Sequence, residues 1–391
     1  MAVVERSLAP DLARGLMLSL IAVANVMIYL HARPYGLRQH IVEDGALDQA
    51  VTAVLVVLVD ARAYPLFAAL FGYGLARIMA NQRSRGLDAV QARAVVRRRA
   101  LVLVGFGLAH AVLAFSGDIL GWYGLLGAVL AARLHADDRI LLRAAVVWLV
   151  FASAVQGLVY SDPNVSEQRS FLWSFAIDGA AEAAAWRLLE WAMTPFGLLA
   201  VVSPLLVGVW AARRGILEHP DRHRPLLRWT AAIGIAAGVI GGIGMALVTI
   251  GAWTAPYPVI LALSWAHIAT GVLCGLGYAA VIALWAARLR RRHGAALPPA
   301  VDALRAAGER SLTCYLAQTV VFATLLPAWA LGWGATLGTA GAAVLALATW
   351  VVTVAGADLL ARAGRRGPAE ALLRRLAYHR SRGATVRGTI G

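Results

Sequence analysis

Residues 97–127 read RRRALVLVGFGLAHAVLAFSGDILGWYGLLG, and this stretch indicates the fold class of the whole chain. Three arginines precede an apolar run that contains a single histidine, His110. A Ser-Gly-Asp turn ending at Asp118 leads directly into a second apolar run. Ionisable side chains next to such runs are unfavourable in a lipid bilayer unless they are paired or used. We therefore interpret the stretch as a membrane hairpin whose tip carries a histidine and an aspartate.

The composition extends this interpretation to the full chain. Of its 391 residues 60% are hydrophobic and 15% are charged, and the mean hydropathy is +0.69. The apolar residues recur in runs long enough to cross a bilayer, which predicts an all-α, polytopic transmembrane bundle. The run at 12–30 is too long for the hydrophobic region of a signal peptide and lacks a small-residue cleavage site. We expect it to remain as the first membrane helix.

The basic residues indicate orientation rather than nucleic-acid binding. The net charge of +15 comes from arginine alone, because the sequence contains no lysine. The arginines cluster in short loops between apolar runs, as they do on the cytoplasmic side of membrane proteins, where they also attract anionic lipid headgroups. Cys274 and Cys314 both lie within apolar runs. They predict neither a disulfide framework nor a metal site.

The arrangement of these runs predicts a single integral membrane domain over residues 1–391. About ten spans with both termini in the cytoplasm follow from the arginine bias. A further apolar run at 50–59 is about half the length needed to span a bilayer, and we expect a short re-entrant or interfacial helix on the outer side. The predicted parts are helices one to five (12–160), an external amphipathic segment (161–192), helices six to ten (193–360), and a basic cytoplasmic tail with a surface helix (361–391).

His110 is the strongest catalytic candidate, as a general base or a transient acyl carrier. The alternative is a hydrogen-bonded core histidine that bridges two helices. Asp118 lies about 80° around and ~12 Å along an ideal helix from His110. The two side chains therefore cannot pair on one straight helix and meet only if the turn at Gly117 folds back. We expect them to contribute separately to one cavity.

Two polar stripes offer a lining for a substrate passage. Both follow helical spacing, so that each stripe lies on nearly one helix face. The alternative for the first stripe is a packing seam with a structural ion pair. The first consists of Asp11, Arg14 and Asn25, and the second of Ser311, Tyr315 and Gln318.

Arg62 is a further candidate for binding an anionic substrate group, because it lies near the outer surface against the arginine bias. A structural partner, Asp60 or Asp118, explains it equally well. The segment Phe71–Gly74 reads Phe-Gly-Tyr-Gly, and in an apolar helix it favours close helix packing over a phosphate loop. No HExxH, Walker A, GxSxG or zinc-ligand spacing occurs in the chain. We therefore predict no metal.

Several stretches together resemble the YeiB-like (DUF418) family of bacterial multi-pass membrane proteins. They follow the family's order along the chain, with Cys314 and Ala371 in place of the family's common Asn and Trp. The matching pieces are Asp11-x-x-Arg14-Gly15 with Asn25; Phe71–Gly74; Arg98-Arg99, Gly105, His110 and Gly117–Leu120 with Tyr123; Gly308-x-x-Ser311-Leu-Thr-x-Tyr315-Leu-x-Gln318; and Gly367-Pro-x-Glu370 with Arg374, Arg375 and Tyr378.

This family is distantly similar to the transmembrane acyltransferase superfamily, which includes heparan-α-glucosaminide acetyltransferase-like proteins. The resemblance implies a helical fold in a bacterial cytoplasmic membrane that moves an acyl group from a cytoplasmic acyl-CoA to an extracytoplasmic acceptor. A histidine is the usual catalytic residue there. It implies acetyl-CoA or another acyl-CoA as donor, and a small molecule or an envelope glycan or lipid as acceptor.

Two other functions remain open on the sequence. Membrane-embedded His, Asp and Arg residues also serve proton relays, so a proton-coupled transporter or exporter of a small solute is one alternative. A non-catalytic envelope or lipid-binding protein is the other. Membrane lipids are expected partners in every case, and a homo-oligomer is compatible with each.

Overall fold

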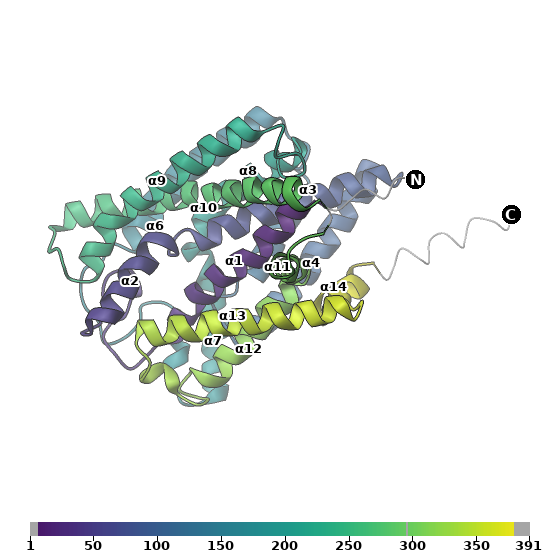
Figure 1. The fold of residues 1–391 in the computed structure, drawn as a ribbon. Helices are drawn as coiled ribbons and strands as arrows, with labels where there is room; N and C mark the ends of the chain where they lie inside the picture. The colour runs from purple at the N-terminus through teal and green to yellow at the C-terminus, as the bar shows by residue number, and fades with distance from the viewer. Residues whose placement is uncertain (1–6, 295, 379–391) are drawn as a thin grey trace.

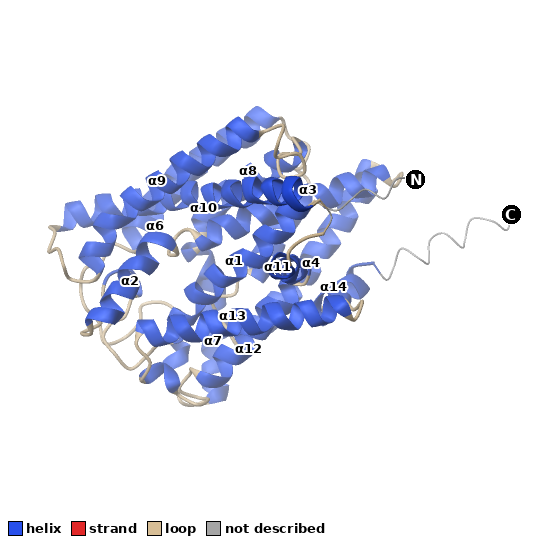
Figure 2. Cartoon of the chain, in the orientation of Figure 1, coloured by secondary structure: helices blue, strands red, loops and turns tan. Residues whose placement is uncertain are grey.

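A computed structural model describes residues 7–294 and 296–378 of the chain, and throughout these ranges the regular structure is helical (Figures 1 and 2). Its α-helices are α1 Leu8–Val26, α2 Ala46–Leu58, α3 Ala63–Ser84, α4 Ala89–Leu113, α5 Leu120–Leu130, α6 Asp138–Val159, α7 Ala180–Gly197, α8 Val202–Arg213, α9 Arg224–Thr249, α10 Tyr257–His293, α11 Pro299–Glu309, α12 Ser311–Leu325, α13 Thr339–Arg362 and α14 Pro368–Tyr378. Short 3-10 turns occupy some of the connections.

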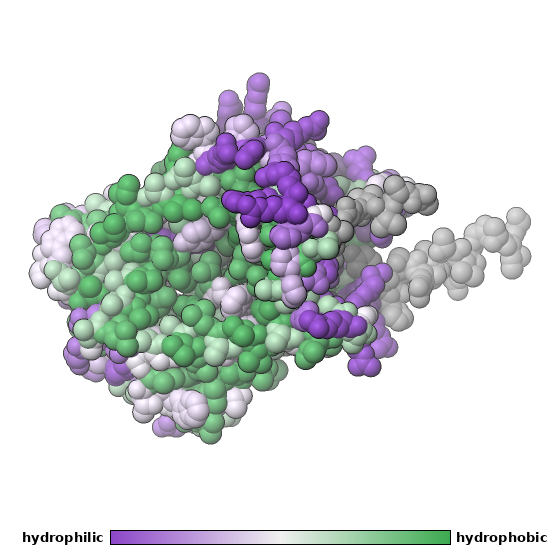
Figure 3. Space-filling view, in the orientation of Figure 1, coloured by the Kyte–Doolittle hydropathy of each residue, from purple (hydrophilic) through white to green (hydrophobic). Residues whose placement is uncertain are grey.

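Within the described residues, six helical segments are long and apolar enough to cross a membrane. They are 8–29, 46–84, 138–159, 224–249, 257–293 and 339–362. The pair α7 and α8, bent by 53°, makes a seventh if it forms one span. The helices α5 and α12 are apolar but shorter. The protein is thus an all-helical membrane protein, with hydrophobic side chains over most of the face seen in Figure 3.

The helix α1 lies at the centre of the bundle (Figure 1). It packs against α3, α10, α11, α12 and α13, and Leu12 and Ile21 on it are fully buried. Around it, α9 packs along α10, α3 along α8, and α4 along α5. This arrangement places polar groups of α1 in the interior, where each requires a partner.

Small residues let two of these helix pairs approach closely. A Cβ atom on Gly72 of α3 would lie 2.1 Å from the Leu205 carbonyl oxygen of α8, and one on Gly208 would lie 2.0 Å from the Ala69 carbonyl oxygen. Real side chains do not tolerate such distances, so both positions require glycine. The interpretation of Phe71–Gly74 as a packing motif is confirmed at Gly72.

Arginine-rich segments share one end of the molecule, where hydrophilic side chains gather in Figure 3. The Ser7 hydroxyl donates to the Leu217 carbonyl (2.9 Å), and Arg98 donates to the Leu376 carbonyl (3.0 Å). The start of the described chain and the helix α14 therefore both lie at this end, which we call the basic end. The opposite end, called the outer end, contains the loop 30–45 and the turn 59–62.

One predicted segment differs from the structure, and another is found as predicted. The amphipathic segment expected over 161–192 is an α-helix only from Ala180, and Trp173–Ala176 form a 3-10 turn after the left-handed Leu172. The surface helix of the tail is present as α14, whereas residues 379–391 lie outside the described residues. The Glu370 carboxylate accepts from the Leu312 and Thr313 backbone amides (2.8 and 3.1 Å), so it caps α12 rather than its own helix.

Candidate functional site

His110 and Asp118 form a directly hydrogen-bonded pair, contrary to the expectation that they act separately. The His110 Nδ1 atom lies 2.8 Å from the Asp118 Oδ1 atom. His110 is 7% exposed and Asp118 is 0% exposed. The helical geometry that separates them does not apply, because α4 ends at Leu113 and the chain folds back before α5 begins.

Local hydrogen bonds explain this reversal. The Ala114 and Phe115 amides both donate to the His110 carbonyl, which closes the last turn of α4. The Asp118 Oδ2 atom then accepts from the Gly121 amide (2.8 Å), one of the unpaired donors at the start of α5. One carboxylate thus satisfies a helix terminus and a histidine together, and its orientation is fixed by both.

Glycine permits the two helices to meet at this point. A Cβ atom on Gly107 would lie 2.1 Å from the Gly121 amide nitrogen and 2.4 Å from the Asp118 Oδ2 atom. Only a residue without a side chain fits there. The pairing of His110 with Asp118 therefore depends on Gly107, one turn before the histidine in α4.

The second nitrogen of the imidazole contacts a hydroxyl from another helix. The His110 Nε2 atom lies 3.0 Å from the Thr319 Oγ1 atom of α12, which is 3% exposed. When Nδ1 donates its hydrogen to the Asp118 carboxylate, Nε2 is left as an acceptor for the Thr319 hydroxyl. The order carboxylate, imidazole, hydroxyl is the arrangement by which many enzymes activate a hydroxyl for nucleophilic attack.

A cluster of aromatic rings packs beside His110. The Tyr29 ring contacts those of Phe115, Phe175 and Phe322, and the Phe115 ring centroid lies 6.0 Å from that of His110. On the side toward the basic end the nearest ring is Tyr315, with a centroid distance of 5.1 Å. Tyr315 also lines a large cavity.

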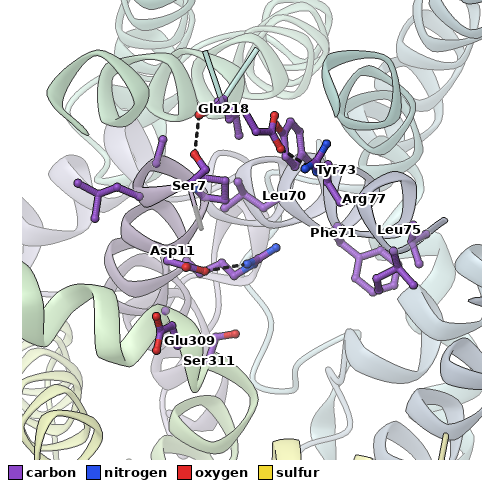
Figure 4. A pocket seen from close by; sticks show the side chains of 18 of the residues that line it. Ser7, Asp11, Leu70, Phe71, Tyr73, Leu75, Arg77, Glu218, Glu309 and Ser311 are labelled. Atoms are coloured by element: carbon purple, nitrogen blue, oxygen red, sulfur yellow. Dashed lines mark hydrogen bonds and ion pairs between the residues drawn. The ribbon is translucent and has the colours of Figure 1, made fainter. Parts of the chain in front are cut away.

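This cavity, the inner vestibule, has a volume of about 1100 Å³. Its walls come from α1, α3, the middle of α4, the loop 215–221, the end of α10, and the junction of α11 and α12. Figure 4 shows Tyr73, Arg77 and Glu218 on one wall and Glu309 and Ser311 on the facing wall, with Asp11 between them. The innermost lining includes Leu103, Leu120 and Tyr315, which neighbour the His110 site in sequence or in space.

Charged groups line the inner vestibule toward the basic end, and the carboxylates among them already have partners. Arg14 pairs with Asp11 (3.1 Å) and Arg77 pairs with Glu218 (2.8 Å). Arg85 and Arg99 also line the inner vestibule, and neither forms an ion pair within residues 7–294 and 296–378. The inner vestibule thus combines an apolar end with arginines suited to an anionic group.

Burial raises the pKa of Glu218 to about 7, although Arg77 beside it favours the ionised carboxylate. Because the pKa is raised on folding, the folded protein holds this proton more tightly than the unfolded chain does. Its contribution to stability is present at acid pH and is lost as the pH rises through about 7. We therefore expect the Tm of the Glu218→Gln variant to fall less than that of the wild type between about pH 5 and about pH 8. Equal slopes in a thermal-shift series would contradict this assignment.

The two predicted stripes only partly line the inner vestibule. Asp11, Arg14, Ser311 and Tyr315 lie on it, whereas Asn25 and Gln318 do not. The Asn25 side chain accepts from the Tyr64 hydroxyl (2.9 Å) deeper in the bundle. Gln318 instead faces α13 and donates to the Thr353 hydroxyl (3.3 Å).

Arg62 has neither of the expected aspartate side chains as its hydrogen-bond partner. It is fully buried and donates to the Gly238 carbonyl (2.6 Å) and the Asp60 backbone carbonyl (2.6 Å). Its Nη1 atom lies 2.9 Å from the His267 ring. The Asp60 carboxylate pairs with Arg38 instead (2.7 Å). Arg62 thus joins α3, α9 and α10 and does not line the inner vestibule.

Thr319 is the site residue that the sequence interpretation missed. It continues the spacing of four residues from Ser311 through Tyr315, so that it lies on the same helix face. Threonines in membrane helices commonly return their hydroxyl to the helix backbone, and Thr319 also contacts the Tyr315 carbonyl (3.3 Å). That ordinary role makes the residue inconspicuous in a sequence.

No group of three His, Cys, Asp or Glu side chains in the described ranges is placed to hold a metal ion. The same part of the chain contains two free, buried cysteines.

Comparison with known proteins finds a family match and a relative. Residues 211–380 match the family described as "Protein of unknown function (DUF418)". The chain is 26% identical over 365 residues to the "Uncharacterized protein YxaH" of Bacillus subtilis (strain 168), with 85% of this chain and 83% of that protein covered. No solved structure matches the chain. The C-terminal part of the chain, residues 211–380, thus matches the DUF418 family.

Proposed function

We propose that the protein is a membrane acyltransferase that takes an acyl group from a cytoplasmic acyl-CoA and passes it to an extracytoplasmic acceptor. The observation that carries this proposal is the Asp118–His110–Thr319 chain beside the inner end of the inner vestibule. In this proposal the basic end faces the cytoplasm of a bacterial cell, both termini lie there, and about ten helical segments cross the cytoplasmic membrane.

The inner vestibule has the polarity that an acyl-CoA requires. Arginines line it toward the basic end, where phosphates of the donor bind, and apolar side chains such as Leu103 and Leu120 line the end where the acyl group lies. Guanidinium groups bind phosphate oxygens with two parallel hydrogen bonds. We therefore assign the inner vestibule to the donor.

The chemistry requires that Tyr315 move aside so that the thioester reaches His110. His110 Nε2 takes the proton of the Thr319 hydroxyl, and the oxygen attacks the thioester carbonyl carbon. A carbon–oxygen bond forms, the carbon–sulfur bond breaks, and the CoA thiolate leaves with the proton from His110. An acceptor hydroxyl then displaces Thr319 by the same route in reverse, with His110 first as base and then as acid. Asp118 keeps the imidazole in the required tautomer throughout.

The test uses the full-length protein, purified and reconstituted in lipid nanodiscs, with radiolabelled acetyl-CoA. Transfer of label to Thr319, detected by peptide mass spectrometry, or to an envelope glycan or lipid fraction supports the proposal. Absence of label from both, with a protein that binds acetyl-CoA, would overturn it.

Two arginines provide a prediction for donor binding. Replacing Arg85 or Arg99 by glutamine is expected to raise the KM for acyl-CoA by about tenfold with little change in kcat, since each removes a charge-assisted hydrogen bond to the donor. Arg143→Gln is the matched control, because Arg143 is an exposed arginine of α6 outside the inner vestibule. Equal KM values for all three variants would remove the inner vestibule from the donor site.

A proton-coupled transporter is the second candidate, and a specific observation favours it. A second, smaller cavity lies toward the outer end, and Tyr64 on its wall donates to Asn25. Alternating access exposes one site to each side of the membrane in turn, and cavities that approach from opposite ends of a bundle offer the two routes. Solute uptake into proteoliposomes that depends on a pH gradient, without any acyl transfer, would select this function. A non-catalytic role predicts instead that His110→Ala changes neither measurement.

A further inference from the structure

The second cavity, which we call the outer chamber, is a polar site distinct from the one assigned above. It has a volume of about 190 Å³. Its walls come from the second half of α1, the loop around residues 38–41, the turn at 59–61, and the segments at 169–172 and 197–201. No residue of the Asp118–His110–Thr319 chain lines it.

Its charged groups leave an excess of positive charge. Arg38 holds Asp60 with two hydrogen bonds (2.7 and 3.1 Å), so that these two charges cancel. Arg169 also lines the outer chamber, but it contacts the face of the Tyr35 ring (4.6 Å) and the Met27 carbonyl (3.2 Å). No carboxylate of the described chain forms an ion pair with it. The outer chamber therefore favours a ligand with one negative charge.

Hydrogen-bonding capacity remains unused on both arginines. The Arg38 side chain is only 5% exposed, and its Nη1 atom has no hydrogen-bond partner among the described residues. The same holds for the Arg169 Nε atom. Buried guanidinium nitrogens are almost always paired, and unpaired ones beside a cavity are suited to oxygen atoms of a bound ligand.

The remaining lining limits the size and shape of such a ligand. Tyr64, Tyr160 and Phe171 supply aromatic surface, and Val201 and Ile268 supply aliphatic surface. At about 30 Å³ for each water molecule, the outer chamber has room for roughly six waters. It thus suits a short carboxylic acid with an apolar or planar body and is too small for a lipid.

Unusual backbone conformations are concentrated around the outer chamber. Five non-glycine residues of the described chain have a left-handed φ, and Arg38, Gln39, Ala61 and Leu172 among them line this cavity. The side chain of Gln39 is held by the Ser170 amide (2.7 Å). Strained residues persist where the surrounding structure imposes them, and they are frequent at ligand sites.

We propose that the outer chamber binds a small monocarboxylate, with Arg169 and the free edge of Arg38 facing its oxygen atoms. The proposal is independent of acyl transfer. It applies equally whether the bound carboxylate is an acceptor of the acyl group, a transported solute or a regulator.

The test is direct binding to the purified full-length protein in detergent. Acetate, propionate and benzoate are compared with acetamide, propionamide and benzamide by isothermal titration and by the shift in Tm. We expect at least one carboxylate to bind saturably and its amide not to bind. Arg169→Gln is expected to weaken that binding at least about tenfold, and Arg169→Lys, which keeps the charge, less so.

Two controls locate the binding. Arg33→Gln removes an outer arginine that pairs with Glu43 (3.1 Å) and does not line the outer chamber, and it should leave the affinity unchanged. Arg85→Gln tests whether the carboxylate binds in the inner vestibule instead, and it should also have no effect. The proposal is overturned if the amides bind as well as the carboxylates, if no carboxylate binds, or if Arg169→Gln and Arg169→Lys both bind like the wild type. None of these results depends on whether the protein transfers acyl groups.

Discussion

Replacing His110 with alanine is expected to reduce acyl transfer by about 10³-fold, within the range of 10² to 10⁴ that a positioned acid–base group contributes. The reason is that His110 is the group in contact with both Asp118 (2.8 Å) and Thr319 (3.0 Å). Asp118→Asn should cause a loss of similar size. An amide NH₂ group directed at Nδ1 stabilises the tautomer that carries its proton on Nε2, and that nitrogen then cannot accept one from Thr319.

Substitutions at Thr319 distinguish the chemical role of its hydroxyl from the packing role of its side chain. Thr319→Ser keeps the hydroxyl and should retain most of the activity, whereas the nearly isosteric Thr319→Val should lose acyl transfer and the acyl adduct together. The measurement is single-turnover transfer from radiolabelled acetyl-CoA in nanodiscs, with circular dichroism and gel filtration to show that each variant is folded.

His135→Ala is the control for the loss of a histidine, since His135 is an exposed residue in the loop after α5. It should transfer at the wild-type rate. If a folded His110→Ala or Thr319→Val variant transferred acyl groups at the wild-type rate, the hydrogen-bonded side chains of Asp118, His110 and Thr319 could not be the catalytic group. A loss in Thr319→Val but also in Thr319→Ser would show that packing, and not the hydroxyl, is what matters.

The second large effect is expected at Gly107, and Gly105, two residues before it in α4, provides the control. Gly107→Ala places a Cβ atom 2.1 Å from the Gly121 amide nitrogen and 2.4 Å from the Asp118 Oδ2 atom, so α5 must move away. Overpacking of this kind costs about 1–3 kcal/mol. The same movement takes Asp118 away from His110, and we expect Gly107→Ala to lower both the Tm and the rate of transfer.

Gly105→Ala is the matched control. A Cβ atom on Gly105 meets no other atom within 4 Å, and alanine stabilises a helix interior by up to about 1 kcal/mol relative to glycine. Its Tm should equal or exceed that of the wild type, with unchanged transfer. The measurement is thermal unfolding of the wild type, Gly105→Ala and Gly107→Ala in the same detergent. Equal destabilisation by both alanines would mean that helix–helix contact at Gly107 does not hold the site together.

The sequence indicated the catalytic candidates but not their arrangement. His110 and Asp118 are recognisable because ionisable groups at the tip of an apolar hairpin are unusual. Their hydrogen bond was not predictable from helical spacing, because it depends on the path of the six residues 114–119 and on the close approach at Gly107. Thr319 is 209 residues away from His110 in the chain. No local pattern reports a contact over that distance.

Arg62 illustrates the same limit for a single side chain. Its position near the outer end, against the arginine bias, was a correct reason to expect a specific partner. The partners are backbone carbonyls and a histidine of α10, and these are contributed by packing of helices that are distant in sequence. Arg169, which carries the excess charge of the outer chamber, had no sequence signal because it lies in an irregular segment between helices.

The sequence by itself determined that the chain is an all-helical membrane protein and that its arginines gather in the loops between apolar runs. These properties are local: the length of an apolar run and the charge of the loop beside it decide them. The tertiary structure decided which polar groups share a cavity and which are sealed inside the bundle. The physical reason is that each buried polar group must find its partner across a helix interface. The geometry of those interfaces is set by close packing at positions such as Gly72 and Gly107.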